Sequence, residues 1–180
     1  MCESKSPIIR RSSLQEIEAH LENLGGGNQE DNIRNTSPLP NYYLIRLSED
    51  EFFNLIFLQN DEVADIAPRG EDRRLRAVTG RALRLYDSGD TDLSENWNLE
   101  AILKRLKKNH PKKTGFELPP LVLRDARGSE RRYRGGRWYI QDGCHRALAY
   151  AMALLREDLT YQPQRAFCAT GSALLDCSGR

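Results

Sequence analysis

The sequence predicts a single α/β (α+β) domain in which helices pack against a small mixed sheet, preceded by a helical N-terminal arm. Three observations predict this class. Short apolar runs typical of strands alternate along the chain with longer stretches whose apolar residues recur at helical spacing. The length of 180 residues fits one domain. The hydrophobic content of 39% is enough for a core without disulfides or structural metal ions.

The first 40 residues are expected to form an arm and a linker outside the core domain. Ser13 is a favourable N-cap for a helix, and the glycines from Gly25 to Gly27 end it. The apolar positions of this helix keep helical spacing: Leu14, Ile17, Leu21 and Leu24. The polar stretch 28–40 indicates a linker. We therefore place the core domain at residues 41–170 and a polar tail at residues 171–180.

The core domain is expected to begin with a strand that three helices follow. Residues 42–47 suit a buried strand, and the sequence from Ser48 to Glu51 suits the start of a helix. The arginine-rich stretch 69–86 has apolar residues at helical spacing, although Gly80 weakens a helix by about 1 kcal/mol relative to alanine. Residues 98–108 are amphipathic and predict the third helix.

The C-terminal part of the domain predicts two strands, a helix and a last strand. Residues 118–124 and 137–141 are strand candidates, and a β-hairpin with a polar, arginine-rich loop is their simplest connection. A helix is expected from Cys144 to about Arg156, and a strand from Gln164 to Ala169.

The junction between the strand at 137–141 and the next helix has the features of an anion-binding site. The first turn of a helix carries unpaired N–H groups and the positive end of the helix dipole. Gly143 permits a tight turn of the backbone, while His145 and Arg146 add donor side chains at the same place. A phosphate group fits this combination.

The segment from Asp142 to Arg146, which reads Asp-Gly-Cys-His-Arg, resembles the signature of the ParB/sulfiredoxin superfamily. The helix at 98–109 and the strand at 118–124 are similar in order and spacing to what this family places before its motif. The resemblance covers residues 97–155 well and residues 42–170 loosely. It implies a ParB/sulfiredoxin-like fold that holds the phosphates of a nucleotide with four residues: Gly143, Cys144, His145 and Arg146.

Within this superfamily the motif looks most like that of the free serine kinases, which also carry the Asp. This resemblance implies phosphoryl transfer from ATP or ADP, with Mg²⁺, to a small hydroxyl-bearing acceptor, and it places Asp142 beside the transferring group. In those enzymes a second acid nearer the N-terminus helps to deprotonate the acceptor. Asp61 or Glu62 matches that acid loosely, and a solvated acidic turn is the competing interpretation of the two residues.

A sulfiredoxin-like, ATP-dependent thiol enzyme is the second interpretation. Sulfiredoxins carry Gly-Cys-His-Arg, with the Cys as nucleophile, and Cys144 matches that position. A thiol in the first turn of a helix beside a cation has a lowered pKa, which favours the thiolate. The carboxylate of Asp142, next to Cys144, opposes thiolate formation.

A non-catalytic ParB-like module that binds a nucleotide or DNA is the third interpretation. Its candidate DNA surfaces are the arginine-rich stretches 69–84 and 124–137. Acidic residues interrupt both stretches, and a net charge of +1 gives the whole molecule no attraction for nucleic acid. Nucleic acid is therefore the less favoured partner.

Two further classes of site and partner find no support in the sequence. The four cysteines have no Cys-x-x-Cys spacing, and the histidines near them show no metal-ligand pattern, so we expect neither a zinc site nor a disulfide framework. The sequence lacks an apolar run of the roughly 18 residues that a membrane span needs, and its first residues lack the apolar core of a signal peptide. We expect a cytoplasmic protein.

Overall fold

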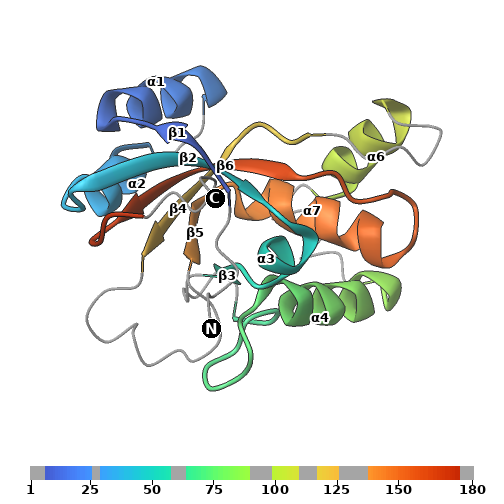
Figure 1. Ribbon diagram of the computed structural model, residues 1–180. Coiled ribbons are helices and arrows are strands. Elements are labelled where there is room, and N and C mark those ends of the chain that lie inside the picture. Colours follow the sequence, from blue (N-terminus) through green and yellow to red (C-terminus); the bar gives the residue numbers. More distant parts are fainter. Residues whose placement is uncertain are drawn as a thin grey trace.

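The fold is a six-stranded mixed sheet with helices on both faces (Figure 1). The mixed α/β class predicted from the sequence is confirmed. The structure is a computed structural model, and the residues it describes are 7–25, 29–57, 64–89, 99–109, 117–125 and 138–174.

The sheet has the strand order β1-β2-β6-β4-β5-β3. Neighbouring strands are antiparallel for β1 with β2, β2 with β6, and β4 with β5, whereas β6 with β4 and β5 with β3 are parallel. The predicted hairpin partners are thus antiparallel neighbours. The strands comprise β1 (Ile8–Arg11), β2 (Asn41–Leu47), β3 (Ile56–Phe57), β4 (Leu121–Asp125), β5 (Trp138–Asp142) and β6 (Gln164–Thr170).

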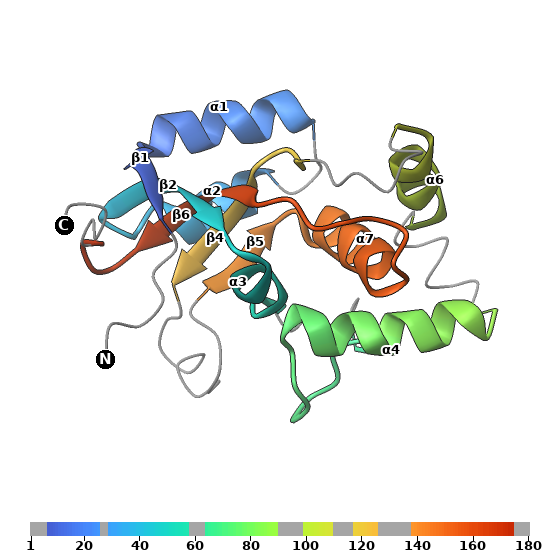
Figure 2. The same cartoon turned by 45° about the vertical axis from the view of Figure 1, so that its right-hand side comes forward.

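Two groups of helices cover the two faces of the sheet (Figure 2). The larger group comprises α3 (Glu49–Phe53), α4 (Leu75–Asp87), α6 (Leu99–Asn109) and α7 (Cys144–Leu155). The opposite face carries α1 (Leu14–Leu24) and α2 (Gln29–Thr36). Among the described residues, no helix has the length and apolar character needed to cross a membrane.

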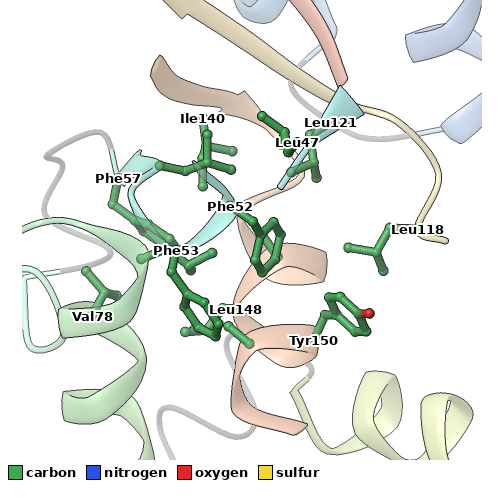
Figure 3. Packing of buried hydrophobic residues seen from close by; sticks show 14 of the residues in the cluster. Leu47, Phe52, Phe53, Phe57, Val78, Leu118, Leu121, Ile140, Leu148 and Tyr150 are labelled. Carbon is green, nitrogen blue, oxygen red and sulfur yellow. The ribbon is translucent and has the colours of Figure 1, made fainter. Parts of the chain in front are cut away.

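The main core lies between the sheet and the larger helix group, and α7 lies at its centre (Figure 3). Every residue of α7 from Ala147 to Ala153 is buried. Four of these seven residues are alanines, so the helix can approach its neighbours closely on several sides. The ring of Phe52 on α3 packs edge to face against Tyr150 of α7, with centroids 5.7 Å apart. This packing holds α3 against α7.

Several predicted boundaries agree with the structure to within a few residues. Ser13 caps α1 by accepting a hydrogen bond from the Glu16 N–H, and Gly25 ends the helix in the left-handed conformation. Ser48 and Glu51 form a reciprocal capping box at α3. The helix α4 accommodates Gly80 in its interior.

The N-terminal region differs from the arm and linker expected from the sequence. Residues 8–11 add a strand to the sheet, and part of the predicted linker forms α2. Ile17 and Leu21 of α1 are buried in a second apolar cluster with three sheet residues: Leu44, Val122 and Phe167. Both faces of the sheet are apolar, so the face opposite the main core must also be shielded from water. The N-terminal helices pack on that second face. The described part of the predicted tail is also tethered, since the Leu174 N–H donates to the Tyr43 hydroxyl over 3.1 Å.

This arrangement predicts that α1 contributes to the stability of the whole fold. Ile17 is fully buried, so we expect Ile17→Ala to lower the free energy of unfolding by about 2–4 kcal/mol. Ile9 on β1 is 42% exposed, so the matched change Ile9→Ala should cost less than about 1 kcal/mol. Urea unfolding followed by circular dichroism measures both. Equal, small losses in the two variants would show that α1 is the detachable arm that the sequence suggested.

Candidate anion site

The turn between β5 and α7 brings the residues of the predicted motif together. Asp142 ends β5, Gly143 is the N-cap of α7 with φ +97°, and Cys144 begins the helix. A Cβ atom on Gly143 would lie 2.5 Å from Leu121 Cδ2 and 2.9 Å from Arg146 Nη2. Glycine is therefore required at position 143 for two reasons. The positive φ disfavours other residues, and the neighbouring side chains leave no room for a Cβ atom.

Arg146 and Asp142 form an ion pair across this turn. Arg146 Nη2 lies 3.0 Å from Asp142 Oδ2, and the two side chains are only 25% and 22% exposed. Gly143, the N-cap residue of α7, has no side chain and makes no capping hydrogen bond. The first turn of a helix carries N–H groups and a positive partial charge that suit an anion.

Arg146 also has donor capacity left over. A guanidinium carries five N–H donors. Its Nε is buried and has no hydrogen-bond partner among the described residues. Because this Nε is shielded from solvent, an anion that binds at the turn contacts the other N–H groups of Arg146 and those of the helix. His145, at the same turn, is exposed.

The Asp142 carboxylate is held from a second side by α2. Asn32 Nδ2 donates to Asp142 Oδ1 over 3.3 Å, and Gln141 Nε2 donates to Asn32 Oδ1 over 2.9 Å. A β-bulge makes this possible. Val122 of β4 pairs with Asp142 of β5, whereas the next residue of β4, Leu123, pairs with Ile140, so Gln141 is an extra residue in β5. The extra residue on β5 lets both Gln141 and Asp142 reach Asn32.

Cys144 is a protonated thiol in this environment. Part of the residue is exposed, but its Sγ is directed at the Ile140 carbonyl oxygen, 3.7 Å away. Burial and, after it, the negative charge of Asp142 raise the pKa of the Cys144 thiol to about 12, while a backbone hydrogen bond and the charge of Arg146 lower it by less. At neutral pH the nucleophilic thiolate is therefore disfavoured.

The other predicted site residues lie apart from this turn or outside the described residues. Asp61 and Glu62 fall in a segment that the structure does not describe. The second arginine-rich stretch, 124–137, is described only at Arg124 and Asp125. Within the described ranges, no group of three or more His, Cys, Asp or Glu side chains could hold a metal ion.

The first arginine-rich stretch is largely engaged within the fold. Arg74 pairs with Asp72, and Arg81 pairs with Glu71 at 3.2 Å. Arg81 Nε also donates to the Ile66 carbonyl over 2.6 Å. The guanidinium of Arg76 lies 4.3 Å from the centre of the Phe53 ring. These contacts anchor α4 to the loop before it and to α3.

Comparison with known proteins finds no relative of this chain. No protein-family model matches the chain. No curated protein and no solved structure matches it either.

The environment of Cys144 predicts how alkylation depends on pH. A pulse of iodoacetamide, followed by mass spectrometry of the Cys144 peptide, should show little labelling from pH 7 to 9 and a rise only toward about pH 12. Asp142→Asn removes the negative charge, so the rise should move to lower pH. Protein unfolded in urea provides the reference, with a thiol pKa of about 8.5. Half-maximal labelling of the folded protein near that value would contradict the assignment.

Proposed function

We propose that the chain binds the phosphates of ATP or ADP at the first turn of α7 and transfers a phosphoryl group to a small hydroxyl-bearing acceptor. The observation that carries this proposal is the position of Arg146, which Asp142 holds at the N-terminus of α7, where the N-cap residue is a glycine that makes no side-chain capping hydrogen bond. The resemblance of the segment from Asp142 to Arg146 to the ParB/sulfiredoxin signature supports the same conclusion.

The electrostatics of the turn suit an anion with several oxygen atoms. The N-terminus of α7 carries a partial positive charge of about half an elementary charge, and its N–H groups point outward from the first turn. Arg146 can bind phosphate oxygens through more than one N–H, while His145 is exposed beside it. Phosphoryl transfer depends on such positioning and charge neutralisation more than on covalent chemistry.

Asp142 supplies the base in this proposal. The acceptor oxygen forms a bond to the terminal phosphorus, and the bond from that phosphorus to the bridging oxygen breaks. The nucleotide leaves with one phosphate fewer. The proton of the acceptor hydroxyl passes to the Asp142 carboxylate, which lies at the end of β5 next to the phosphate-binding turn.

The described residues do not form a magnesium site. Asp142 is the carboxylate nearest to the turn, and its two oxygen atoms accept hydrogen bonds from Asn32 and Arg146. Mg²⁺ prefers octahedral oxygen ligands, and the described residues lack the acidic cluster that would hold it. Any Mg²⁺ enters as part of the nucleotide substrate, and no step above runs through it.

The two alternative functions have less support from the geometry. A sulfiredoxin-like reaction needs the Cys144 thiolate, and the raised pKa of this thiol works against it. A DNA-binding surface needs free cations, whereas Arg74 and Arg81 are paired with acidic residues of the same segment.

Three single variants test the proposed function. Arg146→Ala should weaken ATP and ADP binding by about 1.5–3 kcal/mol, the strength of a charge-assisted hydrogen bond. Asp142→Asn should keep nucleotide binding and lose most of the turnover, because the base is gone. Cys144→Ser should keep most of both. Calorimetry measures binding, and release of ADP or AMP with pooled small hydroxyl compounds measures turnover.

Arg84→Ala is the matched control, since Arg84 is exposed on α4. It should leave affinity and turnover unchanged. Turnover that survives Asp142→Asn but vanishes in Cys144→Ser would replace the phosphotransferase with the thiol enzyme. Unchanged affinity in Arg146→Ala for every nucleotide that binds the wild type would remove Arg146 from the site.

A further inference from the structure

A chain of hydrogen bonds crosses from β4 to α2 and ends on the Asp142 carboxylate. Arg124 Nε donates to Gln141 Oε1 over 2.8 Å, and Gln141 Nε2 donates to Asn32 Oδ1 over 2.9 Å. Asn32 Nδ2 then donates to Asp142 Oδ1. Every donor in the chain points the same way, from the guanidinium at one end to the carboxylate at the other.

The two charged ends determine how both amides are oriented. Turning the Asn32 amide over would bring its oxygen against the Asp142 carboxylate. Turning the Gln141 amide over would bring its NH₂ group against the Arg124 donor. The first alternative would place two acceptors against each other and the second would place two donors against each other. Only the observed arrangement therefore satisfies all the polar atoms. Asn32 is only 7% exposed, so water cannot easily replace it.

We propose that Asn32 is a positioning residue that holds the Asp142 carboxylate in register with Arg146. The catalytic consequence rests on the proposed function, in which Asp142 is the base. With Oδ1 held by Asn32 and Oδ2 held by Arg146, the carboxylate has a fixed orientation at the end of β5. Because Asn32 acts on the base while Arg146 and the helix turn hold the phosphates, α2 sets the rate of transfer and leaves nucleotide affinity alone.

The test compares two buried polar residues on the same helix. Asn32→Leu keeps the size of the side chain and removes both hydrogen bonds. Thr36→Val is the matched control, because Thr36 is fully buried four residues further on. Its hydroxyl donates to carbonyls of α2 itself, 2.9 Å from Asn32 O and 3.0 Å from Ile33 O. A purely structural role of α2 would affect the two variants alike.

Two readouts are measured on each full-length protein. The NMR signal of the Arg146 Nε–H reports on the surroundings of the guanidinium that pairs with Asp142; it should keep its wild-type position in Thr36→Val and shift in Asn32→Leu, without reaching the value of a mobile arginine. ATP is the probe for the second readout. In Asn32→Leu, kcat for ADP formation should fall about tenfold to a hundredfold while the Kd for ATP changes less than twofold. Thr36→Val should leave both within twofold.

A double variant covers the case in which Asn32→Leu does not fold. Asn32→Asp combined with Asp142→Asn keeps a donor facing an acceptor at these two positions but moves the carboxylate onto α2. It should recover the urea midpoint that Asn32→Asp alone loses, without recovering turnover. Recovery of turnover would mean that the position of the carboxylate does not matter, and would overturn the proposal.

The outcomes separate this inference from the proposed function. An unchanged Arg146 signal in Asn32→Leu, or equal losses in Thr36→Val, would refute the positioning role. If the wild type neither binds ATP nor forms ADP, the proposed function fails; the Arg146 signal then decides alone whether Asn32 positions Asp142.

Discussion

The ion pair between Asp142 and Arg146 closes over Gly143, and the geometry of the site depends on it. The pair joins the last residue of β5 to the first turn of α7. It can form because position 143 lacks a side chain: a Cβ atom there would press on both Arg146 and Leu121. The buried body of α7 then fixes this turn against the core. A strand, a turn and a helix thus hold one cation beside the first-turn N–H groups of α7.

The same carboxylate also decides which chemistry the turn favours. By holding Arg146 it keeps a cation next to the helix N-terminus, which suits a phosphate. By lying beside Cys144 it adds to the effect of burial and keeps that thiol protonated. A site arranged in this way is better suited to binding an anion than to generating a thiolate. The sequence Gly-Cys-His-Arg is compatible with both anion binding and thiol chemistry. The negative charge of Asp142 disfavours the thiolate and so distinguishes between them.

Sequence patterns predicted the elements and the turn well, because both depend on local physics. Ser13, Gly25 and Ser48 mark helix ends through their own backbone and side-chain preferences, and Gly143 marks a turn in the same way. Asn32 was missed because its role depends on residues 110 positions away. It lies in a polar stretch that reads as a linker, and no pattern distinguishes it from Asn28 or Asn35. The expected arm is part of the fold for a similar reason: the pairing of β1 with β2 and the packing of α1 on the second apolar face of the sheet both join residues far apart in the sequence.

The central claim is that an anion binds at the first turn of α7. An NMR titration of the full chain with ADP tests it most directly, with backbone amide signals followed residue by residue. The account predicts saturable shifts that are largest at Cys144, His145 and Arg146 and that are lost in Arg146→Ala. Shifts confined to the arginines of α4, or no shift at any amide of the first turn of α7, would contradict it.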